Sequence, residues 1–151
     1  MKSRYLFQSS VWILQRNGLS YADEILKIGD YKTVANRSYY AVFSAMRAVL
    51  ALDSFDSKKH SGIIAEFRRR YLKTEILPKE LSETIDSLVE IRQGSDYDDF
   101  YIVSKEEVTL QLKNARLFVT EVEKYLNYNI DWSIPPSNAA KHNPNLVHEI
   151  A

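Results

Sequence analysis

The chain of 151 residues contains no cysteine, which excludes disulfide bonds, thiolate metal sites and a thiol nucleophile. It has only four glycines and four prolines, so long helices meet few interruptions. No apolar run approaches the roughly eighteen residues of a membrane span, and no signal-peptide pattern opens the chain. We therefore expect a cytoplasmic protein with no membrane contact.

The sequence also lacks net charge, because 20 basic residues balance 20 acidic ones. The molecule as a whole therefore has no excess charge with which to attract nucleic acid. The two signs are nevertheless separated: Lys58 to Lys73 holds six basic residues and one acid, whereas Glu80 to Glu107 holds nine acids and two basic residues. One interpretation is a pair of solvated helix faces. The other is a basic strip that contacts phosphates beside an acidic neighbour.

Apolar residues recur at helical spacing through most of the chain, and 45% hydrophobic with 26% charged residues is typical of a globular domain. The periodicity predicts five helices, at about Ser3–Lys27, Tyr31–Leu52, His60–Leu72, Pro78–Tyr97 and Ser104–Asn127. Gly29 and Asp30 are expected to end the first helix. Ser104 and Glu107 have the spacing of a capping box at the start of the last helix.

This pattern predicts an all-α fold, an up-and-down helical bundle of about five helices that occupies residues 1–128 as one domain. Residues 129–151 are rich in Asn, Pro and Ser, and Pro135, Pro136 and Pro144 exclude a long helix there. We expect this irregular C-terminal tail to be extended or partly disordered.

One face of the second expected helix carries polar groups at three- and four-residue steps, namely Arg37, Tyr40, Ser44 and Arg47. One interpretation is an exposed polar face. The other is a subunit interface or ligand face, because Arg and Tyr are enriched in buried contacts between proteins.

Arg92 continues the apolar row of the fourth expected helix, four residues after Leu88. A guanidinium at an inward-facing position needs an anionic or hydrogen-bonding partner. Asp96 is expected to pair with Arg37 or Arg92 rather than to act as an acid catalyst.

The sequence gives little support for a metal site, a phosphate-binding loop or a covalent nucleophile. His60, His142 and His148 are far apart and form no paired-histidine motif. A glycine-rich phosphate loop and a Gly-x-Ser-x-Gly elbow are both absent. We expect no metal site and no cofactor.

Three segments resemble the HEPN domain, a small all-helical family linked to RNA cleavage and to nucleotidyltransferase partners: Asn36 to Phe43, Lys59 to Ile63 and Arg92 to Tyr97. The resemblance covers about Ser20 to Leu126. In the ribonuclease members of the family an Arg is followed, after four to six residues, by a His. Their site is metal-free and lies at a homodimer interface, where the Arg steadies phosphate charge and the His moves a proton.

The position of that histidine is occupied here by Tyr97, and a phenol of ordinary pKa about 10 is a poor general base near neutral pH. The chain looks most like the subgroup with an Asp-Tyr ending, which resembles the HEPN partners of minimal nucleotidyltransferases. In related toxin–antitoxin pairs, that partner adenylylates a HEPN tyrosine two residues after the histidine position. This chain has Asp99 there, with Tyr101 close by.

His60 belongs to the segment 59–62 at the start of the third expected helix, and its role there has two interpretations. It caps or packs the start of the third helix, or it supplies an imidazole to a cleft around Arg92. Tyr39 and Tyr40 are expected to be core and interface aromatics.

These features support three hypotheses. The first is a homodimer that binds RNA or nucleotide, has little or no catalytic activity and acts with a nucleotidyltransferase partner. Its candidate binding residues are Arg37, Tyr40, Arg47, Arg92, Asp96 and Tyr97. The second is a metal-independent endoribonuclease toxin that uses Arg92 with His60 or Tyr97. The third is a helical interaction subunit without catalytic activity.

Overall fold

The computed structural model describes residues 19–97 and 103–129, and these two ranges contain helices and turns with no strand. The elements in chain order are η1 (Leu19–Tyr21), α2 (Ala22–Lys27), α3 (Tyr31–Ala51), α4 (His60–Phe67), the π-helical turn η2 (Arg68–Leu72), α5 (Leu81–Tyr97) and α6 (Lys105–Asn129). The predicted all-α helical bundle is confirmed. Most of the first predicted helix and residues 130–151 of the predicted tail lie outside the described ranges, whereas Asn129, expected in the tail, ends α6.

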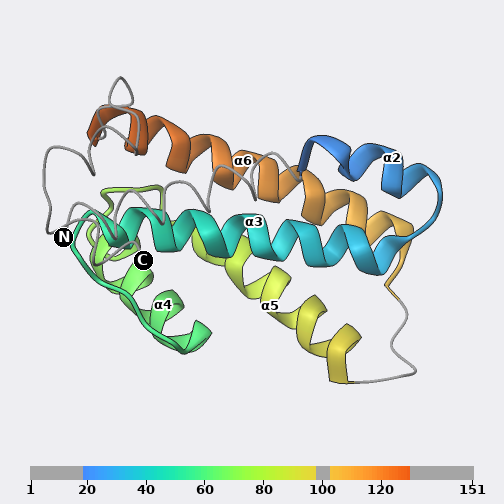
Figure 1. The fold of residues 1–151 in the computed structure, drawn as a ribbon, viewed down its shortest axis with the longest axis horizontal. Coiled ribbons are helices and arrows are strands. Elements are labelled where there is room, and N and C mark those ends of the chain that lie inside the picture. The colour runs from blue at the N-terminus through green and yellow to red at the C-terminus, as the bar shows by residue number, and fades with distance from the viewer. Residues whose placement is uncertain (1–18, 98–102, 130–151) are drawn as a thin grey trace, which may run out of the picture.

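Helix α3 lies at the centre of the bundle and contacts α2, α4, α5 and α6. Figure 1 shows α6 and α2 on one side of α3, with α4 and α5 on the other. Ala41, Ala45 and Ala48 of α3 are fully buried, and their small side chains let neighbouring helices approach closely. This arrangement places α4 and α5 on the same side of α3.

The apolar stripes predicted from periodicity form the core. Six apolar residues that recur at helical spacing along α6 are all buried: Val108, Leu112, Ala115, Val119, Val122 and Leu126. Phe67 at the end of α4 meets Phe118 of α6, with ring centres 5.7 Å apart, and both rings are fully buried. Burial of one such side chain contributes roughly 1.5–3 kcal/mol.

Local signals fix several helix ends. Gly29 has φ +83°, a left-handed conformation that favours glycine, and it follows α2 directly after Ile28. The Asp30 carboxylate caps α3 by accepting from the Thr33 backbone N–H at 3.3 Å and its hydroxyl at 2.7 Å.

The predicted capping box at the start of α6 is confirmed. Ser104 Oγ accepts from the Glu107 N–H at 3.1 Å, and Glu107 Oε2 accepts from the Ser104 N–H at 3.3 Å. Two backbone donors that have no partner inside the helix are thereby satisfied.

Two helix boundaries differ from the prediction. Helix α5 begins at Leu81 rather than at Pro78, because the Pro78 carbonyl accepts from the Leu81 N–H at 3.1 Å in a tight turn that precedes the helix. The third predicted helix is divided at Phe67, after which the Lys73 N–H donates to the Arg68 carbonyl at 2.8 Å in a π-helical turn.

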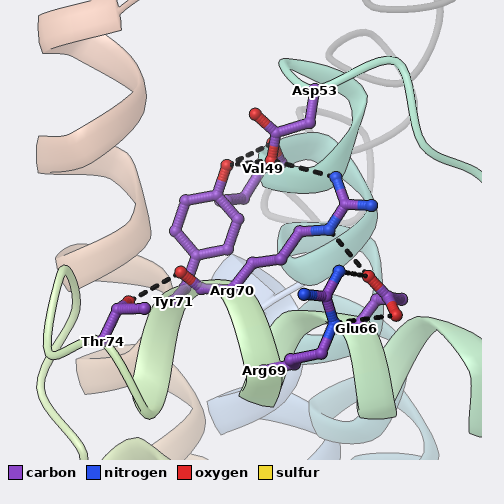
Figure 2. A network of polar contacts seen from close by, with 7 residues as sticks. All are labelled: Val49, Asp53, Glu66, Arg69, Arg70, Tyr71 and Thr74. Carbon is purple, nitrogen blue, oxygen red and sulfur yellow. Dashed lines mark hydrogen bonds and ion pairs between the residues drawn. The ribbon is translucent and has the colours of Figure 1, made fainter.

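The π-helical turn carries a polar network that reaches the end of α3 (Figure 2). The Tyr71 hydroxyl donates to Asp53 Oδ2 at 2.6 Å, and Arg70 Nη1 lies 3.6 Å from the same oxygen. Arg69 and Arg70 each contact Glu66 Oε2 at 2.7 Å, and these bonds lower the pKa of Glu66 to about 2. Burial and then the bond to Asp53 raise the pKa of Tyr71 well above its ordinary value.

We expect Tyr71→Phe to lower the free energy of unfolding by about 1 kcal/mol at neutral pH, because the hydrogen bond to Asp53 is lost. The difference between the two proteins should shrink above the ordinary tyrosine pKa of 10.0. In that range the unfolded wild-type chain releases a proton that folded Tyr71 retains, so wild-type stability falls as pH rises.

Urea unfolding of both proteins from neutral pH to about pH 11 measures this difference. Tyr128→Phe is the matched control, because the Tyr128 side chain is 93% exposed and should show no such change. A constant difference between wild type and Tyr71→Phe would mean that Tyr71 ionises as readily in the folded protein as in the unfolded chain.

Candidate phosphate-binding site

A hollow of about 180 Å³ opens between α3, α4 and α5, and we name it the Arg92 cleft. Its lining residues are Tyr39, His60, Ser61, Ile64, Val89, Arg92 and Gln93. They come from three separate segments of the chain, which the packing of α4 and α5 against α3 brings together.

Arg92 is held by three aromatic side chains. Its Nη2 donates to the Tyr40 hydroxyl at 3.0 Å, and its Nη1 lies 3.1 Å from Nδ1 of His60. Its Cζ lies 4.5 Å from the centre of the Tyr39 ring and 5.1 Å from that of Tyr40. A guanidinium over aromatic faces is stabilised by the ring quadrupoles. Arg92 was expected to need an anionic or hydrogen-bonding partner, and His60 and Tyr40 are two such partners.

His60 is the first residue of α4, and its ring packs against Phe43 with centres 4.0 Å apart. Nδ1 lies 2.9 Å from the Tyr39 hydroxyl as well as 3.1 Å from Arg92. Guanidinium N–H groups only donate, so Nδ1 accepts and the proton of the neutral ring is on Nε2. Burial, then the charges of Arg92 and Arg47, lower the pKa of His60.

An ion pair holds the loop that leads into α4. Arg47 on α3 donates from Nε to Asp56 Oδ1 at 3.2 Å and from Nη2 to Oδ2 at 3.0 Å. Asp56 Oδ1 also accepts from the Ser57 N–H at 2.9 Å, and Ser57 Oγ accepts from the Lys59 N–H at 3.2 Å. Gly62 permits this close packing, because a Cβ there would lie 2.6 Å from Ser57 Oγ. The start of α4 is thereby fixed against α3.

Tyr40 borders a second hollow, of about 390 Å³. This hollow is lined by Thr33, Asn36, Arg37 and Tyr40. The Tyr40 side chain is 38% exposed and contacts Arg92, so it lies between the two hollows.

The polar face expected on α3 is partly covered by the chain itself. The exposed-face interpretation, one of the two left open, does not hold at Ser44, because this residue is buried. Arg47 is half-buried and paired with Asp56 of the following loop. The end of this face that carries Arg37 and Tyr40 borders the second hollow.

Asp96 and Tyr97 occupy the last turn of α5, and their side chains lie outside the described part of the structure. The expected pairing of Asp96 with Arg37 or Arg92 stays a prediction. The expected role of Tyr97, which replaces the histidine of the ribonuclease members, also stays a prediction.

The three consecutive arginines of η2 each pair with an acid of the same chain. Arg68 contacts Asp86, and both Arg69 and Arg70 contact Glu66. These pairs compensate the basic charge locally, which favours the solvated-face interpretation of the charge pattern over a strip that contacts phosphates.

Within residues 19–97 and 103–129, no group of three or more His, Cys, Asp or Glu residues is arranged to hold a metal ion. In the same ranges no helix combines the length and the apolar character needed to cross a membrane.

Two residues contribute to the site in ways that were not predicted from the sequence. Tyr39 was expected only in the core or an interface, yet it contacts both His60 and Arg92. Tyr39 lies beside Tyr40 in the segment 36–43, which resembles the HEPN domain, and this position was the sequence signal that could have indicated a role in the site. Asp56 lies in a loop without periodicity, and nothing in the sequence marks it as the partner of an arginine on α3.

The sequence pattern of the HEPN domain matches residues 16–125. The chain belongs to the HEPN domain family. "Putative toxin MJ0142" of Methanocaldococcus jannaschii is 34% identical over 96 residues, which are 64% of this chain and 65% of that protein. The chain thus spans just under two thirds of the length of this relative.

Two further relatives of this HEPN-family chain are matched over more of their length. A "UPF0332 protein" of Thermotoga maritima is 32% identical over 111 residues, covering 74% of this chain and 84% of the relative. "Putative toxin MJ0605" of Methanocaldococcus jannaschii is 26% identical over 119 residues, covering 79% and 87%. The family predicted from the sequence is confirmed.

Proposed function

We propose that this HEPN-family protein binds the phosphate backbone of RNA, or the phosphates of a nucleotide, in the Arg92 cleft. The observation that carries the proposal is the position of the Arg92 guanidinium, which two tyrosines and a histidine hold at the wall of a hollow. A planar guanidinium presents paired N–H donors that match the oxygens of a phosphate.

The second hollow favours a nucleotide chain over an isolated phosphate. Tyr40 offers a partly exposed ring beside Arg92, and Arg37 lines the second hollow together with Tyr40. Stacking of bases on aromatic rings combined with backbone contacts to arginine is typical of single-strand binding. Asp96 and Tyr97 follow Arg92 by four and five residues, and we include them in the proposed binding set.

We further propose that the protein is one component of a toxin–antitoxin-like module with a minimal nucleotidyltransferase as its partner. Two relatives carry names that describe toxins, and the Asp96-Tyr97 ending resembles the subgroup with such partners. A neighbouring reading frame for a small nucleotidyltransferase would support this proposal.

The proposed functional form is a homodimer. The family resemblance implies a cleft at a dimer interface, and the open hollow beside Arg37 and Tyr40 leaves this end of α3 accessible to a second copy. Light scattering at micromolar concentration should therefore give twice the chain mass of 17.5 kDa. A strict monomer would remove the shared-cleft arrangement.

Arg92→Ala should weaken the binding of a short labelled single-stranded RNA by about tenfold or more, because a lost charge-assisted hydrogen bond costs on the order of 1.5–3 kcal/mol. Arg69→Ala is the matched control, since Arg69 is 61% exposed, pairs with Glu66 and lies outside the cleft lining. Binding should also weaken as salt rises. Equal losses from both substitutions would indicate diffuse surface attraction, and a lack of binding would favour the interaction-subunit hypothesis.

A metal-independent endoribonuclease is the second candidate function, and one observation favours it. The His60 imidazole lies 3.1 Å from Arg92, so an arginine and a titratable ring adjoin although the motif histidine is replaced by Tyr97. Arginine would stabilise the phosphate charge, and the imidazole would transfer the proton.

We expect the protein alone to cleave RNA weakly, with any activity resistant to chelators. Such activity should be lost in both Arg92→Ala and His60→Gln, because the proposed reaction needs both groups. Tyr97→Phe should leave it largely intact if His60 is the proton carrier. Cleavage that survives His60→Gln would contradict this assignment.

A further inference from the structure

The Arg92 cleft makes the protonation of His60 depend on Arg92. Nδ1 of His60 faces Nη1 of Arg92 at 3.1 Å, and a guanidinium cannot accept a hydrogen bond. A proton on Nδ1 would therefore face another N–H and would place two positive charges side by side. Without a bound anion, this geometry favours the neutral imidazole.

The other charged groups around His60 act mainly in the same direction. Arg47 approaches from α3, and Lys59 precedes His60 in the chain. The Asp56 carboxylate is close by in the loop, but it is engaged by two nitrogens of Arg47. Burial, Arg92 and Arg47 each lower the pKa of His60.

The protonated ring nevertheless has an acceptor in place. The Tyr39 hydroxyl lies 2.9 Å from Nδ1, and its oxygen can accept from an Nδ1–H. The Tyr39 hydroxyl hydrogen would then have to rotate away from Nδ1, and Arg92 would have to redirect its N–H. A phosphate oxygen in the cleft would offer Arg92 a new acceptor and would compensate its charge.

We propose that an oxyanion bound by Arg92 causes His60 to take up a proton from solvent, so that phosphate binding and His60 protonation are coupled. The proposal rests on the proposed function of the cleft as a phosphate site. An imidazolium then appears beside the phosphate only when the phosphate is present. The coupling is reciprocal, so protonation of His60 must strengthen anion binding by the same factor.

Nuclear magnetic resonance titration of the imidazole signals tests the coupling in the full chain. The probe is a short 2′-O-methyl RNA, which lacks the hydroxyl needed for backbone cleavage and whose phosphodiester charge is constant across the titration. A His60→Gln variant identifies the His60 signal among the three histidines of the chain. We expect the pKa of His60 to rise when the probe is added.

Arg92→Gln provides the decisive comparison. Without the guanidinium, the pKa of His60 should be higher than in the free wild type, and the probe should cause no further rise. Arg69→Gln is the control, because it removes an arginine outside the cleft lining and should leave the probe-induced rise unchanged. Amide spectra of each variant establish that it is folded.

The dependence of probe affinity on pH gives a second readout. Affinity should increase as pH falls through the titration of His60, and His60→Gln should remove this increase. Probe binding that is lost in Arg92→Gln but leaves the pKa of His60 unchanged in wild type would overturn the coupling while sustaining the phosphate site. A complete lack of probe binding to wild type would overturn both.

Discussion

The candidate site depends on the approach of the Arg92 guanidinium to Nδ1 of His60 at 3.1 Å. These residues are 32 positions apart, and they meet because α4 and α5 lie on the same side of α3. Tyr39 contacts both residues: its ring packs against the Arg92 guanidinium, and its hydroxyl is hydrogen-bonded to Nδ1 of His60. Among the residues that line this cleft, Arg92 is the only cation and His60 the only imidazole. Displacement of α4 or α5 would separate them. The chemistry of the site is therefore a consequence of how the bundle packs.

Two features of the fold maintain that packing. The buried alanines of α3 let α4, α5 and α6 approach it closely, and the apolar rows of α5 and α6 complete the core. At the surface, the Arg47–Asp56 pair and the contact between Ser57 and Gly62 fix the loop that enters α4. The Arg47–Asp56 pair also places a charge near the site, since Arg47 adds to burial and Arg92 in lowering the pKa of His60. Arg47 pairs with Asp56 of the loop, and its expected role as a binding residue stays a prediction.

The sequence predicted the helices well because periodicity and capping are local properties. The capping box of Ser104 and Glu107 and the inward row of the last helix both have the predicted form. The start of α5 at Leu81 was missed, because Pro78 suits either a first helical turn or the tight turn before it. The proximity of His60 to Arg92 was one of two open alternatives, since it depends on the crossing of two helices. The role of Asp56 could not be predicted, because an ion pair between a loop and a helix leaves no periodic pattern.

The central claim is that residues from α3, α4 and α5 form one site for a phosphate-bearing ligand. Backbone amide chemical shifts, recorded while a short single-stranded RNA is added, test it most directly. The account predicts saturable shift changes at Tyr39 and Tyr40, at His60 and Ser61, and around Arg92, all with one affinity. Changes concentrated instead on the η2 turn, with these three segments unaffected, would contradict it.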